Sequence, residues 1–470
     1  MLALFAFSCK EETKITTSSP QALNAYNEGV SFLDKFYFSE AKASLETAVQ
    51  LDSNFSLAAA RLALVHWRSA NEPDAKKEID RAAAKSLHAT KYEQMFIRLL
   101  HHMIYYRNAE AASVADSLLS LYPHMAEPYV LRGGLYELSK NYDAALSVYK
   151  KAIDIDTLYA PAAMSLGYVY SARGDEENAI SAMERYIRLV PDAADPRASF
   201  ADILFRAGRY DEALHQYRKS LELKPDYWYA INRIGDVYVV LGRLNEAEKQ
   251  YEEGLSKMLS NDQTRANYLA AKAELDMKRG NFQNALRLYD QALTLDSVGG
   301  RAAYGRVLAL IKLNMLGGAG KMTILIRQEL ERRNLTESGA MLELHVLRAR
   351  IFAAENKFDE ARAACDSAMQ YGSTFNRSLV NLELAKIYLK HEELDEAISA
   401  LEEVLRFNSN APAALLLLTK VYDAMGDKEL TIEIGNRLLE LWKSADKDFQ
   451  DYIELKKILS KILAPSPAST

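Results

Sequence analysis

The sequence predicts an all-α protein: a right-handed α-solenoid of about twelve helix-turn-helix repeats, followed by a C-terminal capping helix. The first observation is composition, since 470 residues include only 11 prolines and 20 glycines. That leaves little turn chemistry for a β-rich or α/β domain of this length. The second is size, because a chain this long must form several cores or one extended array. The third, an internal repeat, favours the array.

The repeat is clearest in the spacing of alanines along the chain. Six of the ten gaps between successive alanines are 34 residues, and the others are 36 to 42. A period of 34 is typical of a helix-turn-helix unit, and the longer gaps indicate loop insertions. The alanines are Ala41, Ala75, Ala111, Ala145, Ala179, Ala213, Ala247, Ala285, Ala319, Ala361 and Ala397.

Other residues recur at fixed offsets from these alanines. Small residues twelve positions earlier predict a close crossing of the two helices in each repeat. Aromatic residues four positions later would fill the gap against the next hairpin. Glycines that precede the second helices suit the left-handed conformation that ends a helix. The small residues are Gly133, Gly167, Ala201 and Gly235; the aromatics are Tyr149, Tyr217, Tyr251 and Tyr289; the glycines are Gly174, Gly208, Gly242 and Gly280.

These motifs resemble the tetratricopeptide repeat family over residues 22–445. The resemblance implies one solenoid over that range, with possible irregular breaks near 261–265 and 300–341. Residues 446–463 form an amphipathic segment that we expect to cap the end of the stack. The last residues, 464–470, are expected to be disordered.

The N-terminal residues 1–21 resemble the end of a bacterial lipoprotein signal peptide, with Ser8 before Cys9. The charged residues 10–12 also resemble the surface-export signal of lipoproteins in the Bacteroidetes group. The segment departs from the pattern, because it has no basic start and its apolar run, residues 2–7, is short. We expect lipidation of Cys9, a flexible tether up to residue 21, and a lipid-anchored place in the bacterial envelope. The alternative is a disordered start on a cytoplasmic protein.

Charge and motif content argue against nucleic-acid binding and catalysis. The 58 basic and 64 acidic side chains are interspersed, with a net charge of −6, so no basic surface for nucleic acid is predicted. The segment 315–323 imitates a phosphate-binding loop but lacks two of its four defining residues, which indicates a strained hairpin loop. We predict no catalytic residues, metal site or cofactor, and therefore no enzyme.

The resemblance implies that the first helix of each repeat lines a concave groove. Aromatic, amide and charged side chains there suit an extended or helical peptide. We therefore expect a scaffold for a protein or peptide partner, with contact to a membrane only through the lipid anchor. The alternatives are a cytosolic regulatory or sensor protein, and an accessory protein for glycan or peptidoglycan handling that stacks sugars on its aromatics. The expected groove residues are Tyr168, Asp202, Phe205, Arg206, Tyr229, Asn232, Arg233 and Asp236.

Overall fold

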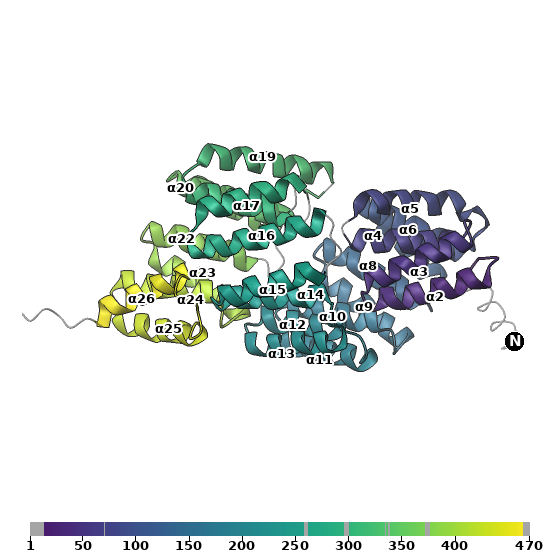
Figure 1. The fold of residues 1–470 in the computed structure, drawn as a ribbon, viewed down its shortest axis with the longest axis horizontal. Coiled ribbons are helices and arrows are strands. Elements are labelled where there is room, and N and C mark those ends of the chain that lie inside the picture. Colours follow the sequence, from purple (N-terminus) through teal and green to yellow (C-terminus); the bar gives the residue numbers. More distant parts are fainter. Residues whose placement is uncertain are drawn as a thin grey trace, which may run out of the picture. The chain divides into compact units, whose positions relative to one another are not determined.

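The computed structural model describes residues 14–69, 71–257, 262–295, 300–333, 335–336, 339–371 and 377–463. Within these residues the chain forms twenty-five α-helices, one short 3-10 helix and no strand (Figure 1). Twelve successive helix pairs are followed by a single C-terminal helix, which confirms the all-α repeat architecture.

The helix pairs follow one another along the chain. The first six are α2 (Pro20–Asp34) and α3 (Phe38–Leu51), α4 (Ser56–Arg68) and α5 (Glu72–Lys85), α6 (Lys91–Ile104) and α7 (Asn108–Leu121), α8 (Ala126–Leu138) and α9 (Tyr142–Ile155), α10 (Ala160–Arg173) and α11 (Glu176–Leu189), and α12 (Asp195–Arg206) and α13 (Tyr210–Leu223). The other six are α14 (Trp228–Val240) and α15 (Leu244–Lys257), α16 (Asp262–Arg279) and α17 (Phe282–Leu295), α18 (Gly300–Lys312) and α19 (Leu316–Arg332), α20 (Gly339–Ala354) and α21 (Phe358–Met369), α22 (Arg377–Lys390) and α23 (Leu394–Phe407), and α24 (Pro412–Met425) and α25 (Lys428–Leu441). The 3-10 helix η1 (Ser86–His88) follows α5, and α26 (Gln450–Leu463) ends the described chain.

The chain divides into two compact units. The first contains residues 1–170 and 177–196, and the second contains residues 171–176 and 197–470. The main boundary thus falls after Pro196, in the first turn of α12, a place where no irregularity is predicted from the sequence. Near the predicted breaks, α16 to α20 each pack against the next helix along the chain, although residues 258–261, 296–299, 334 and 337–338 lie outside the described part.

Each of the eleven alanines that define the repeat has 0% of its surface exposed. In α25, Thr431 stands at the alanine position, and it is also 0% exposed. Its hydroxyl donates to the Asp427 carbonyl at 2.6 Å, which satisfies the polar group inside the hairpin. The alanine spacing therefore marks the closest contact within each repeat.

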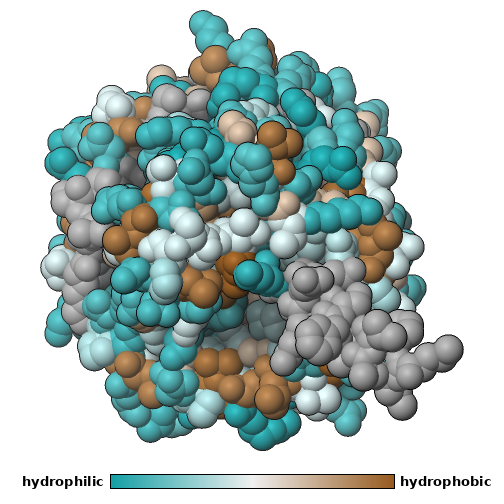
Figure 2. All heavy atoms as spheres, turned by 90° about the vertical axis from the view of Figure 1, so that its right-hand side faces the viewer, coloured by the Kyte–Doolittle hydropathy of each residue, from teal (hydrophilic) through white to brown (hydrophobic). Residues whose placement is uncertain are grey.

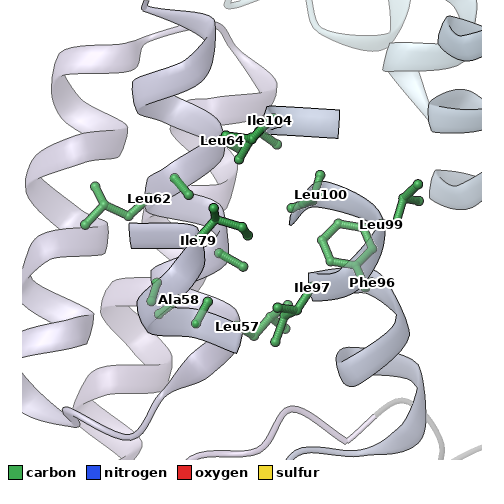
Figure 3. Close-up of a cluster of buried hydrophobic side chains, with 14 of the residues drawn as sticks. Leu57, Ala58, Leu62, Leu64, Ile79, Phe96, Ile97, Leu99, Leu100 and Ile104 are labelled. Carbon is green, nitrogen blue, oxygen red and sulfur yellow. The ribbon is translucent and has the colours of Figure 1, made fainter. Parts of the chain in front are cut away.

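The core of the first unit shows why one helix departs from the amphipathic pattern. Figure 3 shows apolar side chains of α4, Ile79 of α5 and a row of apolar residues on α6 gathered in one cluster. All residues of α4 from Ser56 to His66 are buried. A helix that is enclosed on every side in this way carries apolar residues around its whole circumference.

The first helices of successive repeats contact each other. In the first unit α2 contacts α4 and α4 contacts α6; in the second, α16, α18, α20, α22 and α24 each contact the next member of this series. In a curved stack of hairpins, the helices that touch their counterparts lie on the inner side. First helices are therefore stacked against one another in both units, and the sequence resemblance implies that this side of the solenoid is its concave face.

Part of the expected N-terminal tether is fixed to the first unit. The Thr16 backbone N–H and hydroxyl donate to the two carboxylate oxygens of Glu93 at 2.8 and 2.6 Å. The Thr17 hydroxyl donates to Asp52 at 2.6 Å, and Ser19 caps α2 by accepting from the Ala22 N–H. Flexibility thus remains a prediction for residues 10–13 only, which lie outside the described residues together with Cys9.

Three other expectations can be compared with the structure. The segment 315–323 is not a strained loop, because α19 begins at Leu316 and places residues 317–323 in its first two turns. The predicted capping helix is α26, which packs against α24 and α25. The predicted disordered tail, residues 464–470, lies outside the described residues.

The helices differ from membrane spans in length and polarity. Among the described residues, none of them is long and apolar enough to cross a bilayer. On the face shown in Figure 2, hydrophobic residues are interspersed among hydrophilic ones.

Candidate functional site

Asp202 on α12 lies at the base of a polar cluster on the concave face of the second unit. Its side chain is 5% exposed. The hydroxyls of Tyr217 and Tyr229 donate to its two oxygens at 2.5 Å each, and Arg233 Nε donates at 3.0 Å. These three donors offset the cost of burying the carboxylate. We therefore correct the expectation that Asp202 itself contacts a partner: its carboxylate orients the side chains that surround it.

The cluster continues along successive first helices. Arg233 Nη1 on α14 donates to Asp236 at 2.9 Å, and Asp236 also accepts from the Tyr251 hydroxyl at 2.6 Å. Arg301 on α18 lies 3.4 Å from Asp236 and donates to Glu274 on α16 at 2.6 Å. We call this set the polar ladder; it consists of Asp202, Tyr217, Tyr229, Arg233, Asp236, Tyr251, Glu274 and Arg301.

Access to the ladder increases along its length. The side chain of Asp202 is 5% exposed, those of Arg233 and Asp236 are 24% exposed, and those of Arg301 and Glu274 are 37% exposed. Solvent, and hence a partner, reaches the end formed by Arg301 and Glu274 most easily.

The ladder keeps its charges. Burial opposes the charge of Arg233, but Tyr217, Asp202 and Asp236 outweigh it and raise the pKa of the guanidinium. Burial, followed by the charge of Asp202, raises the pKa of Tyr217, so this hydroxyl remains a donor. Three carboxylates and two guanidiniums give the ladder a net charge of −1.

A spacing in the sequence could have revealed the ladder. An acidic residue precedes a tyrosine by fifteen positions in three consecutive repeats. In two of them the structure shows the resulting hydrogen bond, from Tyr217 to Asp202 and from Tyr251 to Asp236. In the third pair, Glu274 raises the pKa of Tyr289 through its charge, after the larger effect of burial. The tyrosines were predicted only as packing residues, and their hydroxyl chemistry was missed.

The structure places the other expected groove residues in different settings. The Arg233 guanidinium lies 4.8 Å from the centre of the Phe205 ring, a cation-π arrangement. Arg206 is half-buried. Asn232 faces the second helix of its own hairpin, because its Oδ1 lies 3.0 Å from the position of a Cβ on Gly254. Tyr168 is half-buried on α10 and belongs to the first unit.

Two residues that were not among the expected groove residues add to this surface. Trp228, at the start of α14, is 44% exposed and lies edge-on to Tyr229 at 6.1 Å between ring centres. Arg301 completes the accessible end of the ladder. Neither follows from the family positions, because Trp228 stands at the first helical residue and Arg301 follows a segment outside the described residues.

The first unit has its own polar cluster on its first helices. Arg61 on α4 forms a two-pronged pair with Glu127 on α8, at 2.5 and 2.7 Å. The same guanidinium lies 4.6 Å from the centre of the Phe96 ring. Nearby, solvent reaches Asp34, yet desolvation by the surrounding protein raises the pKa of this carboxyl to about 6.

Comparisons with known proteins agree with the repeat architecture. Two sequence models described as tetratricopeptide repeat match the chain, one at residues 126–157 and 160–192 and the other at 352–421. A third, described as the TT21 fifth ARM repeats domain, matches residues 197–311. A search of curated proteins finds no match. The chain therefore contains tetratricopeptide repeats within an all-α solenoid, and such repeats generally provide concave surfaces for binding other proteins.

Several solved structures are similar to parts of this chain. A thermophilic tetratricopeptide protein of Thermus thermophilus is 22% identical, and the match covers 39% of this chain and 99% of that one, with a TM-score of 0.35. A tetratricopeptide repeat protein of Parabacteroides merdae is 18% identical over 56% of this chain and 98% of its own, with a TM-score of 0.38. MamA is 25% identical over 34% of this chain and 93% of its own, with a TM-score of 0.30.

Proposed function

We propose that this tetratricopeptide-repeat chain is a non-catalytic scaffold that binds a protein or peptide partner on the concave face of its second unit. The observation that supports this best is the polar ladder. Its inner members are satisfied by one another, and its outer members, Arg301 and Glu274, are fixed in place but still exposed. Side chains that are ordered before binding lose less conformational entropy when a partner arrives.

The composition of the ladder suggests how the partner is recognised. Trp228 and Phe205 offer aromatic contact area, and the carboxylates and guanidiniums supply directional contacts that set the register of a bound chain. The net charge of −1 favours a partner segment with at least one basic side chain. An extended or helical peptide fits this description best.

We further propose that a lipid on Cys9 attaches the protein to the bacterial envelope. Residues 10–15 separate Cys9 from Thr16, which is hydrogen-bonded to the first unit. Six residues span at most about 20 Å, so the lipid would keep the first repeats close to the membrane. Mass analysis of the N-terminal peptide, beside a Cys9→Ala control, tests this: an unmodified Cys9 in cell-derived protein contradicts the anchor.

Site-specific photo-crosslinking in cells tests the binding surface. Glu274 and Lys272 lie on α16 and each has a side chain that is 37% exposed. Glu274 joins the ladder, whereas Lys272 pairs with Glu248 on the second helix α15 at 3.2 Å. A photoreactive residue at position 274 should form a specific protein adduct, and one at position 272 should not.

The positions at which adducts form test whether the partner binds at the concave site. An adduct that forms equally at both positions, or at 272 alone, contradicts the concave site. A second pair of variants tests the charges: exchanging Glu274 and Arg301 keeps their ion pair but reverses the charges offered to the partner. This exchange should abolish the adduct, detected with the photoreactive residue at Trp228, while helix content stays unchanged.

A further inference from the structure

Within the second unit, the C-terminal repeats contact turns that lie far earlier in the chain. The turns are those between the two helices of a repeat, and each has a glycine at its centre. Gly174 meets Phe407, Gly208 meets Asn408, Gly242 meets Phe449, and Gly280 meets Gln450. The order is the same on both sides, so the two segments run side by side. We call these contacts, made by the turns at Gly174, Gly208, Gly242 and Gly280 with residues 407–410 and 442–451, the closing seam.

The glycines are required by space as well as by backbone conformation. Six other turns of this kind adopt a similar positive φ, between 55° and 60°, without glycine; their residues are Phe36, Tyr106, Lys140, Asn314, Asn356 and Glu392. At Gly242 a Cβ would lie 2.5 Å from the Phe449 ring, and at Gly174 it would lie 2.5 Å from the Phe407 ring. Gly426 has the same conformation, with φ at 77°, but nothing lies within 4 Å of its Cβ position. Glycine therefore recurs where the C-terminal segment must approach the turn.

The centre of the seam combines two buried aromatic rings with several hydrogen bonds. The indole N–H of Trp442 donates to the Val240 carbonyl at 3.0 Å, and the Asp446 N–H donates to the Gly242 carbonyl at 2.9 Å. Asn245 donates twice to the Asp446 carboxylate, at 2.8 and 3.0 Å. Trp442 and Phe449 are 2% and 1% exposed, and their rings meet edge to face at 5.0 Å.

The flanks of the seam are polar. On one side the Asn410 amide donates to the Gly208 carbonyl at 3.3 Å, across 202 residues of chain. On the other, Arg279 pairs with Asp448 at 3.2 Å and Lys278 with Asp451 at 3.1 Å. These flanking contacts are partly exposed and contribute little individually. The seam thus has one small aromatic centre, at Trp442 and Phe449, and a separate ring contact of Phe407 with Gly174.

We propose that the closing seam is a latch that joins the two ends of the second unit's concave face and opens without unfolding the repeats. In a solenoid, each repeat is stabilised mainly by its immediate neighbours. The seam contacts add to that stability but are not needed for it, so loss of the seam leaves the helices paired. While the seam is closed, a chain enters this face more slowly than it does when the seam is open. The latch therefore controls the rate at which a partner reaches the polar ladder; this step rests on the proposed function.

A distance measurement tests the latch itself. Spin labels at positions 219 and 443, in a Cys9→Ser background, report the separation across the seam; Lys219 and Lys443 are 40% and 68% exposed. The remaining Cys365 is buried. Gly242→Ala should lengthen and broaden the distance distribution, while helix content is retained. Gly426→Ala imposes the same backbone strain away from the seam and should leave the distance unchanged.

A second variant tests the latch independently of backbone strain. Trp442→Phe removes the indole donor but keeps a ring, and it should give a smaller shift in the same direction. Equal distances for Gly242→Ala and Gly426→Ala overturn the latch. A loss of helix content that is specific to Gly242→Ala also overturns the latch, because the seam would then belong to the cooperative core. A dimer in which the seam forms between two chains overturns it as well.

The rate of crosslinking at position 274 tests the consequence. Gly242→Ala should raise this rate about tenfold for each 1.4 kcal/mol lost from the closed state. An unchanged rate with a lengthened distance rejects the control of access but leaves partner binding intact. Absence of any adduct in both proteins rejects the proposed function, and the distance measurement still decides whether the latch exists.

Discussion

Two adjacent glycines on α8 should respond in opposite ways to the same substitution. A Cβ on Gly133 would lie 2.1 Å from Cε1 and 2.5 Å from Cζ of Tyr149, whereas a Cβ on Gly134 would meet nothing within 4 Å. Ordinary contacts begin at about 3.4 Å, so the Tyr149 ring must move by more than an ångström. That ring is 1% exposed, and its hydroxyl donates to Glu137.

The magnitude follows from two opposing effects. Replacement of glycine by alanine in a helix interior stabilises the helix by about 0.5–1 kcal/mol at either position. Overpacking against a fixed ring costs about 1–3 kcal/mol at Gly133 alone. Gly134→Ala should therefore stabilise the first unit, and Gly133→Ala should be less stable than Gly134→Ala by about 1–3 kcal/mol.

The assay must be local, because a long repeat array does not unfold in one two-state step. Hydrogen exchange of peptides from α8 and α9 reports the opening free energy of this hairpin directly. Equal slowing of exchange in both variants would refute the reasoning, since it would mean that Tyr149 yields at no cost.

Three other predictions concern separate parts of the chain. Arg233→Ala leaves the Asp202 carboxylate without its charged donor, so hydrogen exchange in α12 and α14 should quicken by an amount equivalent to about 1.5–3 kcal/mol. The control Arg188→Ala removes a 67% exposed side chain and should change this exchange little. Equal effects of the two substitutions would contradict the ladder. Burial raises the pKa of the Cys365 thiol to about 12, so alkylation of native protein at pH 8 should be about a thousandfold slower than that of an exposed thiol, and rapid native labelling would show the site open. The pKa of Asp34 is raised to about 6 from a usual 3.8, so the folded state binds this proton more tightly than the unfolded state does. Asp34→Asn should therefore stabilise the first unit above about pH 6, by at most about 1 kcal/mol since solvent reaches the group, and this gain in stability should vanish below about pH 4. A gain that stays constant across this range would contradict the raised pKa.

The fold could be predicted from the sequence because the same residue types recur at the same positions in most repeats. The alanine positions require burial at a close helix crossing, and their period of 34 therefore survives loop insertions. The division at the start of α12 could not be predicted in this way. The division depends on which repeats contact one another, and residues 190–197 carry the same proline and alanine residues as other connections between helix pairs.

The sequence indicated which helices carry the candidate site residues, but not how their side chains interact. Family positions gave Asp236, and Arg233 was expected beside them for charge pairing; the structure places both on the first helix α14. Family positions give no information about side-chain direction, so Asp202 was expected to meet a partner although its carboxylate is enclosed by two tyrosines. Asn232 lies against the second helix of its own hairpin, where Gly254 leaves room for its amide; its contact with a partner stays a prediction. The closing seam was missed because it joins residues about 200 positions apart, which no local pattern records.

The central claim is that a partner binds along the polar ladder on the concave face of the second unit. Hydrogen exchange of the intact protein, with and without the partner captured through position 274, tests it most directly. The account predicts slower exchange in α12, α14, α16 and α18, with little change in α13, α15 and α17. Protection confined to the second helices, or spread evenly over both sets, would contradict it.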